Sequence, residues 1–421
     1  LKARQIAEGF FIEYKSDFQE PLKIARSIAS FANTYGGWYF VGIVANERNT
    51  PKDLPGFDLS ANPRPLEHIR NVIKDYVDPF PRYYSKLVEL ENGKAILIVE
   101  IPESDETPHI TKNGRIYRRN AEGSDPMVET NRYALDRLYE KSEASVEAIE
   151  RFCRREIVLS EYEKNQAWIE IYLMPYPIDR MNIEAFIDEE FVDGIKERMN
   201  EQTKIEFKDN FYVSMGIPMN VISASTGSII LRQATIESLP FMGLTFELFN
   251  NGNAKIIIPF EYLRWDAELD SAAWTMLISN LEDKYLLRDL YRIINGWKFL
   301  NIFLTIMQKY IDFLKSQRWE DEILIAYKIE NTWRTILFFD SESMAEHVRK
   351  YGVPLCQREN TRIPRNLTKD KMIRKMPEDS LFQIIEFAKI STHFGFFPHE
   401  WGALIRDWLK LIRSQSKSSG A

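Results

Sequence analysis

The amino-acid sequence predicts an α+β protein with two or three domains. Its 421 residues exceed the usual size of one domain. Up to about residue 265, segments with strand-like alternation are interleaved with segments of helical periodicity. From about residue 266 onward, Leu and Ile recur at the three-to-four spacing that is typical of helices. We therefore expect domains at residues 1–142, 143–265 and 266–421, the last of them mainly helical.

The first domain opens with a strand, a helix and a second strand. Residues 10–15 alternate as in a strand. Pro21 suits the first turn of a helix, which we expect to run to residue 35 before an apolar strand at 38–44. The other elements expected in this domain are a helix at 63–77, strands at 94–101 and 115–118, and a helix from about residue 129 that leads out of it.

The second domain follows a charged helical connector at 140–166. Its clearest feature is a β-hairpin around the turn at 250–253, whose sequence is Asn-Asn-Gly-Asn. Its expected elements are strands at 167–173, 227–233, 242–249 and 254–260 and a helix at 183–199. The third domain is expected to hold a helical stretch at 267–316, two strands within 319–340, and a helical pair at 379–413 broken at Gly395 and Pro398.

Composition limits what the chain does. The formal net charge is -7, so binding to phosphate would need a local basic patch. The two cysteines, Cys153 and Cys356, are far apart, which excludes a zinc-binding spacing and favours a reducing compartment. The most apolar run, 297–307, is too short to cross a bilayer, and no signal-like segment opens the chain. We expect a cytoplasmic protein with no membrane partner.

An acidic and a basic residue lie two positions apart on the first expected strand. Glu13 and Lys15 would share a face with Phe11, because alternate strand residues point the same way. In nucleases a carboxylate holds Mg²⁺ while a nearby lysine orients water or offsets phosphate charge. Glu8 would reach the same spot from the preceding turn. The pattern predicts catalytic roles for Glu8, Glu13 and Lys15 and a metal site at Glu8 and Glu13, or else a surface ion pair.

A helix end with small and polar residues forms the second motif. Asn33 and Thr34 precede Gly36 and Gly37, which lead into the apolar strand at 38–44. Paired glycines permit positive φ and close backbone approach. Exposed amides there would hold a phosphate, so all four residues are candidates for nucleic-acid binding. The alternative is an ordinary helix C-cap followed by a tight turn.

Three arginines flank the strand expected at 115–118. Arg115, Arg118 and Arg119 precede a turn of small residues, and guanidinium groups suit bidentate contact with phosphate. Arg118 and Arg119 would point to opposite faces, so only one of them would face a ligand. A solvated basic turn is the alternative.

Taken together, in this order and spacing, these motifs resemble the Schlafen/AlbA-like nucleic-acid-binding domain. The resemblance runs from Glu8 to Ser124, and the turn F-A-N-T-x-G-G leading into V-G-I is its most specific part. It implies an α+β domain with a mixed sheet that binds DNA or RNA. In bacteria such domains often head regulators or defence proteins.

Some animal Schlafens cut tRNA and rRNA with three carboxylates and a divalent metal, and two of these positions fall on Glu8 and Glu13. The resemblance thus implies Mg or Mn as a cofactor. The third acid is expected just after V-G-I, where this chain has Val44 and Ala45. Glu47 and Glu100 are the available substitutes, so the resemblance supports binding better than cleavage.

A basic loop at 349–375 is the second candidate region. It holds nine Lys and Arg against Glu359 and Asp370. Arg362, Arg365 and Lys369 are its candidate phosphate contacts, with a solvated loop as the alternative. The α/β segment at 167–262 is expected to be either a small-molecule or protein sensor or a dimerisation scaffold.

The sequence is therefore compatible with three functions. The first is a DNA- or RNA-binding protein of the bacterial regulatory or antiviral-defence type. The second is a metal-dependent endonuclease that acts on RNA or DNA. The third is a non-catalytic, ligand-responsive transcriptional regulator or a scaffold in a defence assembly. For each we expect a homo-oligomer or a place in a larger protein assembly.

Overall fold

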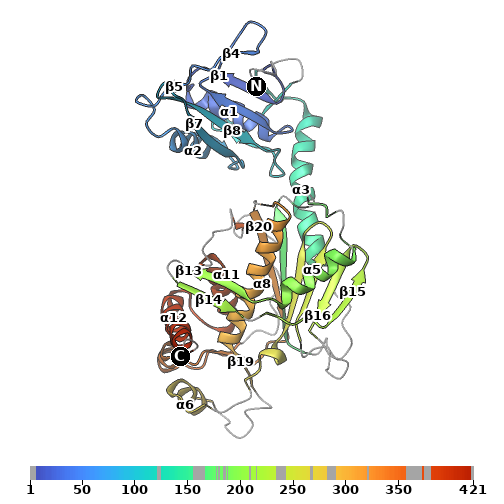
Figure 1. The fold of residues 1–421 in the computed structure, drawn as a ribbon, viewed down its shortest axis with the longest axis vertical. Coiled ribbons are helices and arrows are strands. Elements are labelled where there is room, and N and C mark those ends of the chain that lie inside the picture. Colours follow the sequence, from blue (N-terminus) through green and yellow to red (C-terminus); the bar gives the residue numbers. More distant parts are fainter. Residues whose placement is uncertain are drawn as a thin grey trace. The chain divides into compact units, whose positions relative to one another are not determined.

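The chain divides into two compact units, Leu1–Phe152 and Cys153–Ala421 (Figure 1). The computed structural model describes residues 6–120, 125–154, 166–176, 178, 181–183, 186, 188–207, 210–214, 216–233, 243–265, 269–281, 291–319, 322–356, 372–373 and 381–418. Within these residues, no helix combines the length and apolar character needed to cross a bilayer.

The first unit is built on a mixed five-stranded sheet. Strands β1 and β2 are parallel, and the other neighbouring pairs are antiparallel. The order is β1-β2-β8-β5, with β7 on the other edge of β8. The strands are β1 (Ile12–Lys15), β2 (Gly37–Val41), β5 (Phe57–Asp58), β7 (Tyr84–Glu89) and β8 (Lys94–Ile101). The expected α+β class with a mixed sheet is confirmed.

Two helices cover one face of this sheet. Helix α1 (Pro21–Ala32) connects the parallel strands β1 and β2, and α2 (Pro65–Tyr76) packs beside it. Each begins at a proline, whose missing N–H costs nothing in the first turn. Apolar side chains of both helices form one core with alternate residues of the sheet, among them Tyr39 and Val99. On the opposite face of the sheet, Tyr14, Phe40 and Ile96 form a smaller buried cluster with Ile43.

Short elements complete the first unit. They are the strand pairs β3 (Val44–Ala45) with β4 (Pro51–Asp53), β6 (Val77–Asp78) with β9 (Ile110–Thr111), and β10 (Tyr117–Arg118) with β11 (Met127–Val128), followed by helix α3 (Arg132–Arg154). The segment from β9 to β10 runs beside α1, which brings residues that are distant in sequence to the helix end.

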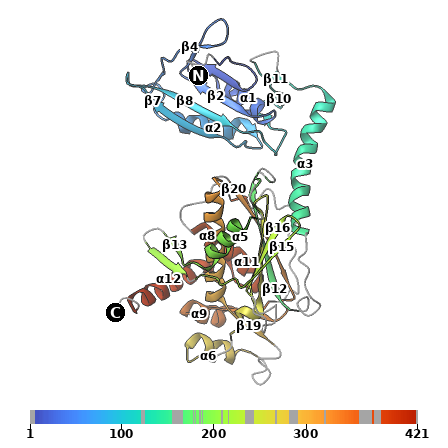
Figure 2. The same cartoon turned by 45° about the vertical axis from the view of Figure 1, so that its right-hand side comes forward.

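The second unit is built on a seven-stranded antiparallel sheet with the order β15-β16-β17-β18-β12-β20-β22. Figure 2 shows α5, α8 and α11 on one side of this sheet. The long helix α8 (Gly296–Ser316) is buried along most of its length in the main core. The strands are β15 (Val221–Ser225), β16 (Ser228–Arg232), β17 (Thr245–Phe249), β18 (Ala254–Pro259), β12 (Trp168–Tyr176), β20 (Glu322–Glu330) and β22 (Met372–Ile373).

The remaining described elements add side chains to that core or pack beside it. They are the pairs β13 (Thr203–Phe207) with β14 (Asn210–Ser214) and β19 (Arg292–Asn295) with β21 (Thr335–Phe338), the helices α5 (Glu189–Asn200), α6 (Ala272–Ser279), α9 (Glu342–Tyr351), α11 (Leu381–Ser391) and α12 (Trp401–Ser418), and three short 3-10 turns at Phe260–Leu263, Thr392–Phe394 and Pro398–Glu400. The break expected at Gly395 and Pro398 separates α11 from α12.

The domain boundary expected between residues 265 and 266 does not divide the structure into two units. Strand β20 lies beyond that boundary, yet it pairs with β12 from Trp168↔Glu330 to Tyr176↔Glu322. Strands from both expected domains thus share one sheet and one core. The local pattern misses this because pairing across about 150 residues leaves no trace in a sequence window.

Candidate nucleic-acid interface and acidic site

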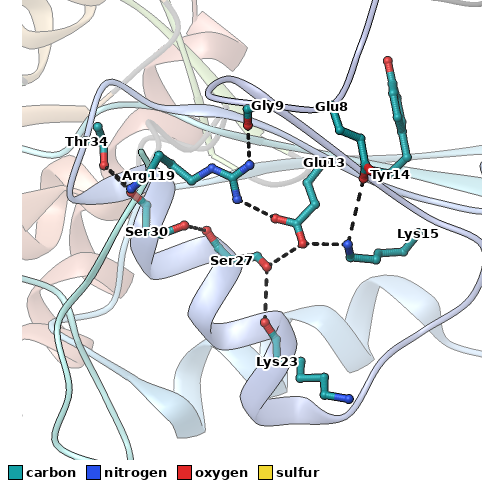
Figure 3. A network of polar contacts seen from close by, with 10 residues as sticks. All are labelled: Glu8, Gly9, Glu13, Tyr14, Lys15, Lys23, Ser27, Ser30, Thr34 and Arg119. Carbon is teal, nitrogen blue, oxygen red and sulfur yellow. Dashed lines mark hydrogen bonds and ion pairs between the residues drawn. The ribbon is translucent and has the colours of Figure 1, made fainter. Parts of the chain in front are cut away.

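Strand β1 places Glu13 in a buried polar network at the contact with helix α1. The Glu13 side chain is 2% exposed. Its Oε1 accepts a hydrogen bond from the Ser27 hydroxyl at 2.9 Å and lies 3.0 Å from Lys15 Nζ. Its Oε2 accepts from Arg119 Nη1 at 2.8 Å (Figure 3). Both carboxylate oxygens are therefore engaged by groups of the protein itself.

Arg119, which follows β10 in the sequence, joins this network. Its side chain is fully buried, and its guanidinium lies 4.5 Å from the centre of the Phe31 ring. It also donates to the backbone carbonyl of Gly9, while its own backbone N–H donates to Thr34 Oγ1 at 3.0 Å. Burial lowers the pKa of Arg119, and the Glu13 charge opposes that shift. Arg119 thus connects β1, α1 and the segment after β10.

Glu8 lies beside this network and is nearly buried. Its Oε1 accepts from the Tyr14 backbone N–H at 2.5 Å and lies 3.9 Å from Lys15 Nζ. Burial raises the pKa of the Glu8 carboxyl above its usual value, although the Tyr14 hydrogen bond and Lys15 act in the opposite direction. The three expected catalytic residues therefore do lie together, with the Lys15 ammonium between the two carboxylates.

The arrangement does not suit a divalent metal. Lys15 occupies the position between Glu8 and Glu13 that a bridging cation would need. Among the residues that the structure describes, no three His, Cys, Asp or Glu side chains group closely enough to hold a metal ion. Mg²⁺ is usually bound through one or two carboxylates with water and phosphate, and it prefers near-ideal octahedral geometry. A metal here would have to displace the lysine.

Neither expected substitute for the third carboxylate joins the pair. Glu13 pairs with Tyr39 of β2, whereas Glu100 pairs with the neighbouring residue Trp38. Because successive strand residues point to opposite faces, Glu100 lies on the face of the sheet opposite to Glu13. Glu47 is exposed on the turn after β3, although that turn approaches Glu8 through a 2.7 Å hydrogen bond from the Glu8 N–H to the Asn49 carbonyl. The position of the expected acid is Ala45, as the sequence indicates.

Asn33 links the end of α1 to the segment from β9 to β10 through side-chain hydrogen bonds. Its Nδ2 donates to the His109 carbonyl at 2.9 Å and to the Tyr117 carbonyl at 3.0 Å. Its Oδ1 accepts from the His109 N–H at 2.7 Å. Asn33 is 3% and Thr34 is 5% exposed. Both side chains are saturated inside the fold, so a phosphate would reach them only if this junction opened.

The glycine pair is required by close packing. Gly36 has φ +77°, and a Cβ there would lie 2.7 Å from the Ile101 carbonyl oxygen and the Glu103 nitrogen. A Cβ on Gly37 would lie 2.3 Å from the Phe31 ring. These distances are too short for any other residue. The F-A-N-T-x-G-G motif therefore acts in this structure as a packed junction between α1, β2 and the end of β8.

The arginines of the third motif differ in their exposure. Arg119 is buried, whereas Arg118 is 34% exposed and pairs with Glu129 at 2.9 Å. Arg115 is exposed. The two neighbouring arginines do point in different directions, and Arg118 and Arg115 are the ones that remain accessible. Arg362, Arg365 and Lys369 of the basic loop lie outside the described residues.

Sequence reasoning missed Ser27 and the pairing of Glu13 with Arg119. Glu13 and Arg119 are 106 positions apart, so only the folded arrangement of α1 and β10 brings them together. It also missed Trp38 and Tyr84, which are exposed aromatic residues on the face of the sheet opposite α1 and α2. The alternation of Trp38 and Phe40 in β2 was a signal that one face of this strand is aromatic.

The first unit is a small α+β domain whose buried polar network connects β1, α1 and the segment after β10. Residues 8–128 match the family model described as Schlafen, AlbA_2, and the N-terminal unit is a Schlafen/AlbA-like domain. The match covers the first unit and not the second. No curated protein matches the chain.

Two solved structures resemble parts of the chain. One is the N-terminal domain of a protein from Nitrosomonas europaea described as related to the ATP-dependent DNA helicase RecG, with 23% identity, 31% of this chain and 90% of that chain covered, and a TM-score of 0.22. The other is the DIP2311 protein from Corynebacterium diphtheriae, with 11% identity, 68% and 83% covered, and a TM-score of 0.23. These TM-scores are too low to support an inference about this chain.

Proposed function

We propose that the N-terminal unit binds nucleic acid without cutting it, so that the chain works as a regulator or defence protein of the binding type. The family match at residues 8–128 supports nucleic-acid binding. The engagement of both Glu13 oxygens by Arg119, Ser27 and Lys15 supports the absence of cleavage. This second observation is the reason for proposing a binding protein rather than a nuclease.

The energetics of the network favour a structural role for Glu13. Removing one partner of a buried ion pair typically costs about 3–5 kcal/mol, because a charge is left without compensation. A metal at Glu13 would have to displace Lys15, and any change in the carboxylate position would weaken the 2.8 Å contact with Arg119. Recruiting Glu13 for catalysis would therefore oppose the stability of the domain.

Fluorescence anisotropy with labelled single-stranded RNA, single-stranded DNA and duplex DNA tests binding. We expect at least one of them to bind the full chain with an affinity that falls as salt rises, because phosphate contacts release counterions. Failure to bind any of the three at low salt would overturn the proposal.

A cleavage assay separates binding from catalysis. The full chain is incubated with tRNA, rRNA and DNA in the presence of Mg²⁺ or Mn²⁺, and we expect all substrates to stay intact. Metal-dependent cleavage that disappears in Glu8→Gln and Glu13→Gln variants of unchanged thermal stability would contradict the proposal and assign the nuclease instead.

For the second unit we propose self-association through strand β15. In the described part of the chain β15 ends the seven-stranded sheet, and four of its five residues are exposed, including Val221. An exposed edge strand offers unpaired N–H and C=O groups to a second strand. Light scattering after size exclusion should give an oligomer for the native chain, a smaller species for Val221→Lys, and no change for the control Leu411→Lys on α12. A native monomer would overturn this proposal.

A further inference from the structure

The face of the N-terminal sheet opposite α1 and α2 carries a row of aligned side chains at one side of the buried cluster of Tyr14, Phe40, Ile43 and Ile96. Strand pairing places Trp38 of β2 opposite Glu100 of β8, and Glu100 opposite Tyr84 of β7. Directly paired residues point to the same face of a sheet. The next row on this face holds Phe40, Ile98 and Lys86. None of the residues in the first row belongs to the core beneath α1 and α2.

The two aromatic residues of the first row are exposed although they lie on regular strands. Trp38 is 38% and Tyr84 is 42% exposed, and Val88, further along β7, is 37% exposed. The Trp38 ring stacks on Phe40, its neighbour on the same strand face, at a centroid distance of 6.3 Å and an interplanar angle of 18°. Trp38 and Tyr84 are separated by two interstrand spacings, or about 10 Å.

Cationic groups lie beside these rings. The Arg82 guanidinium is 5.3 Å from the centre of the Tyr84 ring and donates to the Tyr84 hydroxyl. Lys86 is exposed and two residues from Tyr84 on the same strand face. At the far end of the face, Lys94 lies opposite Asp58. Between the rings, the half-buried Glu100 offers a carboxylate that accepts hydrogen bonds.

We propose that this aromatic face, comprising Trp38, Tyr84, Arg82, Lys86 and Glu100, binds single-stranded nucleic acid by stacking. Exposed aromatic rings on a sheet stack on unpaired bases, and neighbouring cations hold the backbone. Glu100 would accept hydrogen bonds from a base amino group, as acidic side chains do with cytosine. Duplex bases are stacked on each other and present only their edges, so the rings select single strands. This inference rests on the proposed function and names its ligand and its surface.

Anisotropy titrations of the full chain with labelled single-stranded RNA and DNA test the stacking. Loss of one base–aromatic contact should weaken binding by about 5- to 150-fold, so we expect a decrease of this size for Trp38→Ala and for Tyr84→Ala. Trp38→Phe and Tyr84→Phe keep an aromatic ring and should retain most of the affinity. Tyr133→Ala on α3, which removes a side chain that is 71% exposed, is the matched control and should change nothing.

A charge reversal at the exposed Lys86 tests the same face without changing a core side chain. Lys86→Glu should weaken single-strand binding and reduce the slope of log K against log salt by about 0.7 for each phosphate contact that is lost. Lys74→Glu makes the same change at an exposed position of α2, on the covered side of the sheet, and should leave the slope as it is. The aromatic variants should leave the slope unchanged because stacking releases no counterions.

The outcomes separate this inference from the proposed function. Native binding that is unaffected by Trp38→Ala, Tyr84→Ala and Lys86→Glu would overturn the aromatic face while leaving nucleic-acid binding in place. A preference for duplex over single strands would do the same. An absence of binding to any nucleic acid would overturn both. If an alanine variant unfolds in a thermal melt, Lys86→Glu and its Lys74→Glu control decide the matter.

Discussion

Arg119 Nη1 lies 2.8 Å from Glu13 Oε2, and this contact joins the two ends of the Schlafen/AlbA-like domain. Both side chains are almost fully removed from solvent. A carboxylate and a guanidinium in such a setting depend on each other, because neither is compensated by water. The E-x-K pattern, which suggests a catalytic centre when seen alone, is here part of a structural network.

We predict that Arg119→Ala will destabilise the first unit by about 3–5 kcal/mol, because it leaves Glu13 buried with one oxygen uncompensated. Hydrogen exchange of the peptides covering β1 and α1 measures this directly. Arg118→Ala is the matched control, because its pair with Glu129 is partly exposed, at 34% and 14%, and should contribute less than the fully buried pair. Equal effects of the two substitutions would show that the buried pair is not structural.

Asn33→Ala should loosen the junction between α1 and the β9–β10 segment. It removes the partner of the His109 N–H and of the His109 and Tyr117 carbonyls, and each buried group left unsatisfied costs about 1–3 kcal/mol. We expect faster exchange at residues 109–119 and a lower unfolding temperature. Asn71→Ala, at an exposed site on α2, is the control. Native-like exchange in Asn33→Ala would contradict this role.

The stability of the first unit should fall in mild acid because of His109. Burial lowers the pKa of His109 to about 4 from its model-compound value of 6.5. Its Nδ1 faces the Pro79 carbonyl at 2.7 Å, and its Nε2 has no hydrogen-bond partner in the described part of the chain.

For a histidine with a depressed folded-state pKa, the unfolded chain takes up the proton first. Its contribution is therefore fully present above pH 6.5 and is lost as the pH falls toward 4. We expect denaturant unfolding followed by hydrogen exchange to show a smaller difference between pH 7 and pH 5 in His109→Gln than in the native chain. His68→Gln serves as the control. An unchanged pH dependence in His109→Gln would refute this assignment.

Lys255→Met should destabilise the second unit. Lys255 is 1% exposed, and its Nζ lies 3.4 Å from Glu170 Oε2, which also accepts from the Tyr172 hydroxyl. Burial lowers the pKa of Lys255 while Glu170 opposes the shift. Removing the lysine leaves Glu170 buried, at a cost of about 3–5 kcal/mol. Lys328→Met breaks a more exposed pair with Glu330 on β20 and should cost about 1 kcal/mol or less in thermal unfolding. Similar losses in both variants would refute the prediction.

Local patterns were sufficient for the longer elements of the first unit, with the exception of strand β7. The run at 94–101 was predicted as a strand with the bounds that β8 has, because apolar residues bounded by a turn and by Pro102 admit little else. Helices α1 and α2 follow their opening prolines. The short strands β3, β4, β5, β6, β9 and β11 were missed, since so short a segment contains no periodicity. The six-residue strand β7 was missed as well. Strand β19 was also missed, within a stretch that reads as helical.

The amino-acid sequence alone was enough to establish the α+β class, the family resemblance of the first unit, the grouping of Glu8, Glu13 and Lys15, and the absence of an acid at Ala45. Tertiary structure alone determined which partners these residues have. Helix α1 and the segment after β10 converge on β1, which gives Glu13 its partners in Ser27 and Arg119. Strand register aligns Trp38 with Tyr84 across β8. Both outcomes depend on contacts between residues distant in the chain, which local periodicity does not encode.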